Sequence, residues 1–82
     1  MARQYPHELH IGLKVLVYVD PTGHPVEAVV TKIDGDEGRV HVHPVGYKVR
    51  WSAHPRAIAT KSGLFLRFED NQFFFTEHRS LA

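Results

Sequence analysis

Basic and aromatic side chains are interleaved through the middle of this chain, where acidic residues are absent. Residues 38–68 of the 82-residue sequence contain no Asp or Glu, and Tyr47 and Trp51 lie among their cations. Cations on adjacent strands release counterions from nucleic-acid phosphates, and aromatic rings stack on bases. The pattern therefore predicts a nucleic-acid-binding surface made of Arg39, His41, His43, Lys48, Arg50, Arg56 and Lys61.

The formal net charge of +1 conceals this basic segment. All 9 acidic residues lie before residue 38 or after residue 68, and they balance the cations between them. The alternative interpretation is an ordinary solvated strand surface that happens to be basic, since the outward face of any half-buried strand must be polar. Both interpretations remain open at the level of sequence.

The histidines and the missing motifs bear on metal and enzyme chemistry. His41 and His43 are spaced to share one strand face, but no Cys and no carboxylate accompanies them, so we predict no metal site. We expect both to add positive charge as the pH falls towards about 6. The sequence contains no phosphate-binding loop, no nucleophile motif and no zinc-protease motif, so we predict a protein that is not an enzyme and has no cofactor.

Glycine and proline divide the chain into segments of strand length. Alternating or β-branched patterns predict strands at 13–20, 26–34, 39–43, 47–54 and 64–69. A sixth strand is expected around residues 73–75, and residues 56–61 are expected to form a single 3₁₀ turn or a short strand. In the fourth strand, Tyr47, Val49, Trp51 and Ala53 are predicted to face the core, which places Lys48, Arg50 and Ser52 outside.

These elements predict an all-β domain over residues 12–82, in which five to six antiparallel strands with short turns close into a small barrel. Residues 1–11 are expected to form an N-terminal tail or a short strand. More apolar surface remains than one small barrel can hide, unless the N-terminal segment covers it. We therefore predict a protein interface or homo-oligomer contact formed by Leu16, Tyr18, Phe65, Phe73, Phe74 and Phe75.

Three short patterns resemble the SH3-like small barrels of the Tudor and KOW types. They are Gly12-x-x-Val15-x-Val17, Ala28-x-Val30-x-x-Ile33 and Val40-x-Val42, within residues 12–68. The Tudor resemblance implies an aromatic cage for methylated Lys or Arg, with Tyr18, Tyr47 and Trp51 as its walls. The KOW resemblance implies binding to nucleic acid or to polymerase-associated partners.

A more local pattern, Gly46-Tyr47-x-Val49-x-x-x-Ala53-His54-Pro55, is similar to a stretch of the plasmid-borne type II dihydrofolate reductases. Those enzymes are tetrameric SH3-like barrels in which a Val-Gln-Ile-Tyr motif follows this stretch and lines a central pore. This chain has Ile58-Ala59-Thr60-Lys61 at those positions, without the ligand-binding Gln and Tyr. The resemblance implies a barrel and an oligomer, with a reductase as a remote alternative.

The sequence as a whole predicts a non-enzymatic small-barrel binding module. Its expected partner is nucleic acid or a protein within a nucleic-acid complex, and the alternative is a Tudor-like module for protein interaction and oligomerisation. No apolar block near the N-terminus resembles a signal-peptide core, and no run approaches the length of a membrane span. We expect a soluble, cytoplasmic protein with no membrane partner.

Overall fold

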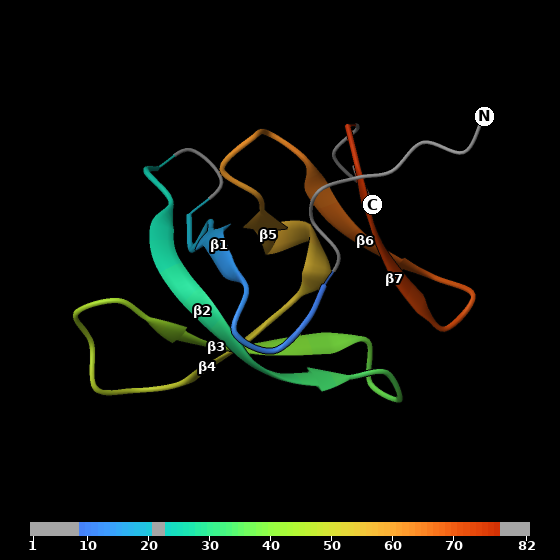
Figure 1. Cartoon of the computed structure of the whole chain (residues 1–82), viewed down its shortest axis with the longest axis horizontal. Helices are drawn as coiled ribbons and strands as arrows, with labels where there is room; N and C mark the ends of the chain where they lie inside the picture. Colours follow the sequence, from blue (N-terminus) through green and yellow to red (C-terminus); the bar gives the residue numbers. More distant parts are fainter. Residues whose placement is uncertain (1–8, 21–22, 78–82) are drawn as a thin grey trace.

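The structure, a computed structural model, describes residues 9–20 and 23–77, and these are almost entirely strands and turns (Figure 1). The expectations for residues 1–8 and 78–82 lie outside the described residues. Within the described part, no helix is long and apolar enough to cross a membrane. The elements are β1 (Lys14–Val17), β2 (Val26–Asp34), β3 (Arg39–Pro44), β4 (Trp51–Ala53), the 3₁₀ turn η1 (Pro55–Ala57), β5 (Ile58–Ala59), β6 (Phe65–Glu69) and β7 (Gln72–Thr76).

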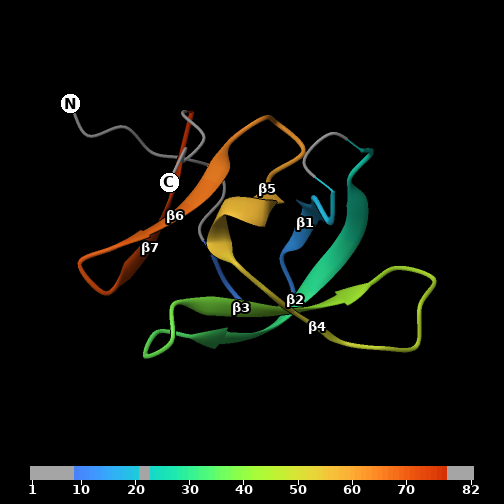
Figure 2. The same cartoon turned by 180° about the vertical axis from the view of Figure 1, so that it is seen from behind.

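The strands form one antiparallel sheet in the order β4-β3-β2-β1-β5-β6-β7. The predicted all-β class is confirmed, with seven strands where five to six were expected. The hydrogen-bonded order is open, with β4 and β7 at its two edges, so the sheet does not close into the predicted barrel. β6 and β7 form a hairpin beside β5, at the opposite end of the strand order from β4 (Figures 1 and 2).

The core lies on the inner side of the curved sheet. Inward positions alternate with outward ones along β1 and β3, as the period-two pattern predicts. Each fully buried aliphatic side chain contributes roughly 1.5–3 kcal/mol to the free energy of folding. The core cluster contains Val15, Val17, Ala28, Val30, Val40, Val42, Ala53, Ile58, Leu66 and Phe75.

A β-bulge in β2 sets which side chains leave the core. Val30 pairs with Val42, and the register then shifts so that Lys32 pairs with His41 and Ile33 with Val40. Strict alternation from Val30 would have turned Lys32 inward, because residues two apart share a face. The extra residue places the Lys32 side chain in solvent and turns Ile33 towards the core.

The predicted fourth strand is much shorter than residues 47–54. Only Trp51–Ala53 pair with β3, and Tyr47 and Val49 are 52% and 53% exposed, so the prediction that they face the core is wrong. Residues 45–50 instead form a loop, which we call the β3–β4 loop. It begins with a tight turn at Gly46, whose φ of 88° diverts the chain from a continuous hairpin.

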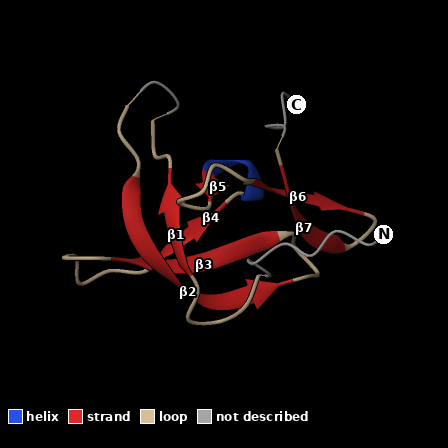
Figure 3. Cartoon of the chain, turned by 45° about the horizontal axis from the view of Figure 1, so that its top comes forward, coloured by secondary structure: helices blue, strands red, loops and turns tan. Residues whose placement is uncertain are grey.

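The segment at residues 56–61 contains both of the expected alternatives. The 3₁₀ turn η1 comes first, with the Nδ1 of His54 accepting the backbone N–H of Arg56 at its start. β5 follows immediately and pairs with β1 on one side and β6 on the other. Figure 3 shows η1 beside β6, and the two elements are in contact.

Candidate nucleic-acid interface

Cross-strand pairing gathers basic side chains on the outward side of β1, β2 and β3. His41 pairs with Lys32 on one side and with Ser52 on the other. In the next row, His43 pairs with Val29, which in turn pairs with Lys14. We call this surface the outer face and define it by Lys14, Lys32, Arg39, His41 and His43.

Arg39 is held in place at one corner of the outer face. Its Nε donates to the Oγ of Ser52 at 2.8 Å, and its Nη2 donates to the Ser52 carbonyl oxygen at 2.9 Å. Because two donors of one planar guanidinium bind the same residue across the strand pair, the charge has a fixed position. Arg39 thus belongs to the outer face and also lines the pocket described below.

Two carboxylates of β2, Glu27 and Asp34, both have partners. Glu27 is 2.7 Å from the Nζ of Lys61, and the hydrogen bond and charge of Lys61 lower the pKa of Glu27 below its ordinary value. Asp34, opposite Arg39, accepts the backbone N–H groups of Asp36 and Glu37 at 3.0 Å. These carboxylates are therefore already engaged when an anion approaches the outer face.

Lys48 and Arg50 lie on the β3–β4 loop, away from the regular strands, and both are exposed. The loop also exposes apolar atoms, since Val45, Tyr47 and Val49 are each more than half exposed. Tyr47 contacts Trp51 with ring centroids 5.8 Å apart and planes tilted by 47°. An aromatic pair thus lies beside the two loop cations.

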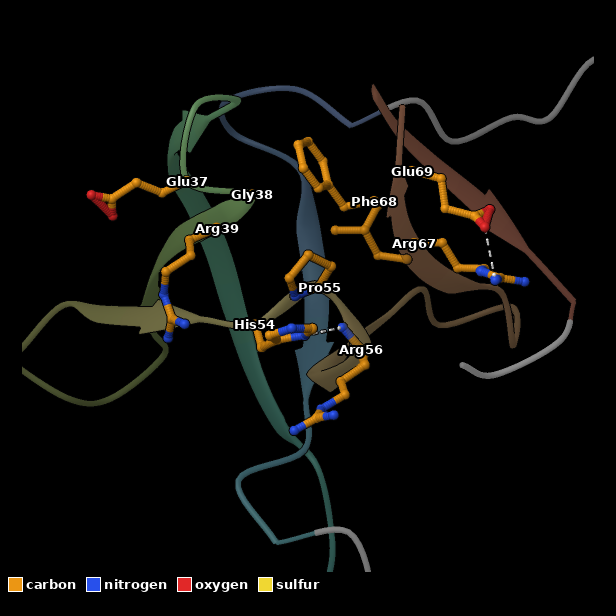
Figure 4. A pocket seen from close by; sticks show the side chains of 10 residues that line it. Glu37, Gly38, Arg39, His54, Pro55, Arg56, Arg67, Phe68 and Glu69 are labelled. Atoms are coloured by element: carbon orange, nitrogen blue, oxygen red, sulfur yellow. Dashed lines mark hydrogen bonds and ion pairs between the residues drawn. The ribbon is translucent and has the colours of Figure 1, made fainter. Parts of the chain in front are cut away.

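A surface pocket of about 350 Å³ lies between the start of β3, η1 and β6 (Figure 4). Arg39, His54 and Arg56 line one side of it, and Glu37 points away from them at its edge. Partial burial, followed by the charges of Arg56 and Arg39, lowers the pKa of His54 below its ordinary value. Arg39 and Arg56 thus place two positive charges beside His54, and Arg67 is paired to Glu69 on the far side of the pocket.

The predicted basic residues do not form one continuous strip. Arg39, His41 and His43 share the outer face, whereas Lys48 and Arg50 extend from the loop. Arg56 lines the pocket together with Arg39 and is not part of the outer face. Lys61 is paired with Glu27, which lies near the start of β2, whereas Arg39 pairs with Asp34 at the end of that strand.

Two cations of the outer face, Lys14 and Lys32, were missed by the sequence prediction. Lys14 precedes buried Val15, so strand alternation would have placed it outside. Lys32 could not be found in this way, because its outward direction depends on the bulge in β2. What joins both residues to the histidines of β3 is cross-strand pairing, which a single sequence does not contain.

The predicted apolar interface divides into residues with different environments. Leu16, Tyr18 and Phe65 are half-buried, and Phe73 packs on Phe68 with centroids 4.6 Å apart. Phe74 is 41% exposed on the edge strand β7. Phe75 lies in the core and is only 6% exposed, so its predicted role in an interface is wrong; it faces inward because strand alternation opposes it to Phe74.

Three of the four residues at the positions of the reductase pore motif are part of the interior, and the fourth, Lys61, is exposed. Ile58, Ala59 and Thr60 are buried, and the hydroxyl of Thr60 accepts the Leu64 backbone N–H at 3.0 Å. Among residues 9–20 and 23–77, no group of three or more His, Asp or Glu side chains is placed to hold a metal ion.

Comparisons with protein-family models, curated proteins and solved structures found no match to the chain. Its function is therefore inferred from the geometry and chemistry of its own residues.

Proposed function

We propose that this domain is a non-enzymatic binding module that contacts nucleic acid, or a protein within a nucleic-acid complex, through its outer face. The observation that supports the proposal best is the pair of rows in which His41 lies opposite Lys32, and His43 and Lys14 flank Val29. Neighbouring strands are about 4.8 Å apart, and side chains two residues apart along a strand are about 7 Å apart. Cations from three strands thus fall within one patch that a phosphate backbone can cover.

We further propose an SH3-like architecture of the Tudor or KOW type. The three short patterns that resemble these barrels support it, because their valines all belong to the core cluster: Val15, Val17, Val30, Val40 and Val42. The pairing of β1 with both β2 and β5, with a 3₁₀ turn before β5, is compatible with a small barrel opened between β4 and β7.

The salt dependence of binding to random-sequence DNA and RNA tests the nucleic-acid proposal. With about four phosphate contacts, the logarithm of the binding constant should fall with log salt at a slope of roughly −3 to −4. Lys32→Ala removes one outer-face cation and should reduce the size of the slope by about one. Arg67→Ala is the matched control, because it removes an equal charge that already pairs with Glu69.

The control variant should keep the slope of the unmodified protein. No detectable binding at low salt would refute the proposal for both nucleic acids. Equal effects of Lys32→Ala and Arg67→Ala would show that net charge matters and that the outer face does not.

A protein-interaction or homo-oligomer function is the second candidate, and edge strand β7 favours it. Among the strands of residues 9–20 and 23–77, β7 has a neighbour on one side only, and Phe74 is exposed on it. An edge strand of this kind can pair with a second chain. We expect sedimentation at micromolar concentration to give a mass above 9.4 kDa, and Phe74→Lys to return it to the monomer value. A monomer mass for the unmodified protein would exclude this candidate.

A further inference from the structure

The β3–β4 loop combines exposed apolar side chains with cations and contains no carboxylate. Val45, Tyr47 and Val49 are 52%, 52% and 53% exposed, and Lys48 and Arg50 lie next to them in the chain. The loop is at one end of the molecule, away from the β6–β7 hairpin (Figures 1 and 2). Nothing within the described residues covers it.

Tyr47 is held in position within this loop. Its backbone N–H donates to the Pro44 carbonyl oxygen at 3.2 Å, which closes a four-residue turn with Gly46 at the third position. The positive φ of Gly46 is the conformation that a type II turn requires there. Val45 adds a second anchor, because its N–H donates to the Glu27 carbonyl oxygen at 2.8 Å.

The Tyr47 ring also has support from the core. It contacts Trp51 on β4, which pairs with Val42 on β3 and packs against the core cluster. The tyrosine is thus fixed at its backbone and on one side of its ring, while half of its surface stays in solvent. A fixed, exposed ring beside two cations is the arrangement on which an unpaired base can stack.

We propose that the β3–β4 loop binds single-stranded nucleic acid, with a base stacked on Tyr47 and the adjoining phosphates held by Lys48 and Arg50. This inference rests on the proposed nucleic-acid function and adds the strand state of the ligand. In a duplex both faces of each base are covered by its neighbours, so a loop side chain has no base face to stack on. Single strands are the form whose bases are available.

Charge and chemistry favour this occupant over a second copy or an acidic peptide. Two copies of the loop would bring like charges together, since Lys48 and Arg50 have no acidic neighbour in residues 39–68. An acidic peptide would satisfy the cations but would leave the exposed Tyr47 ring without a planar partner. A nucleotide supplies both an anion and a ring.

The single tryptophan of the chain gives a direct readout, because Trp51 contacts Tyr47. We would titrate the full chain at low salt with a 12-nucleotide oligothymidine, a duplex of equal length and polyglutamate, and follow tryptophan fluorescence. Oligothymidine should bind most tightly and change the emission of Trp51. Tyr47→Ala should weaken its binding by about 5- to 100-fold, and Tyr47→Phe should retain it.

Val49→Ala is the matched control, because it removes an equally exposed apolar side chain of the same loop that has no ring. Its affinity should equal that of the unmodified protein. Duplex binding as tight as oligothymidine binding, with no effect of Tyr47→Ala, would overturn the inference while the outer-face proposal stands. Polyglutamate binding as tight as oligothymidine would overturn it in favour of an acidic protein partner. Absence of binding to either nucleic acid would refute both proposals.

Discussion

Gly38 is the residue on which the turn before β3 depends most directly. It is buried with a φ of 67°, and a Cβ there would lie 2.7 Å from Cδ2 of Phe68. Gly38→Ala should therefore reduce the free energy of unfolding by roughly 2–4 kcal/mol, from the left-handed backbone and the overpacked contact together. Chemical denaturation measures this loss.

Gly35, in the same turn, provides the control. A Cβ at Gly35 meets no atom within 4 Å, so Gly35→Ala should change the free energy of unfolding by less than about 1 kcal/mol. Gly35 has neither a positive φ nor a close neighbour, so similar losses for the two variants would mean that neither the left-handed backbone of Gly38 nor its contact with Phe68 is responsible.

At the scale of elements, the sequence predicted strands well where alternation and β-branching agreed. β2 occupies residues 26–34 as expected, and β3 extends only one residue beyond its prediction. Residues 47–53 also alternate, yet Tyr47 and Val49 are exposed, because the turn at Gly46 directs the loop away from β3. A period-two pattern identifies which residues would share a face, but it does not show whether a neighbouring strand is there to pair with them.

The candidate interface was only partly predictable for the same reason. Arg39, His41 and His43 were placed on one face by their spacing alone. The contributions of Lys14 and Lys32 depend on register and on the bulge, which are properties of strand pairs. The exposure of Tyr47 was missed entirely, and it is what links the loop to base stacking.

In the whole molecule, folding separates basic and acidic segments that follow one another along the chain. The basic β3–β4 loop lies at one end, and the β6–β7 turn, with Glu69 and Asp70, lies at the other (Figure 1). Such a distribution orients an approaching polyanion towards the loop before contact. A formal charge of +1 is therefore compatible with a strongly oriented encounter.

The stability of the whole fold should depend on pH through His54, which lies beside Arg39 of β3 and Arg56 of η1. Burial and the charges of Arg56 and Arg39 lower its pKa below 6.5, and its Nδ1 accepts the Arg56 N–H at 3.2 Å. A protonated nitrogen cannot accept that bond. The unfolded chain has neither effect, so it binds the proton at a higher pH than the folded chain does. Acidification through 6.5 therefore favours unfolding, and this contribution to stability is lost as the pH falls to the lowered pKa.

His54→Asn isolates this contribution, because Asn retains an acceptor for the Arg56 N–H but does not titrate. The free energy of unfolding, measured in urea from about pH 8 to 5, should fall more steeply for the unmodified protein than for the variant below about pH 6.5. The remaining histidines affect both proteins alike, so the difference between the two curves belongs to His54. Parallel curves over this range would show that folding does not lower the pKa of His54.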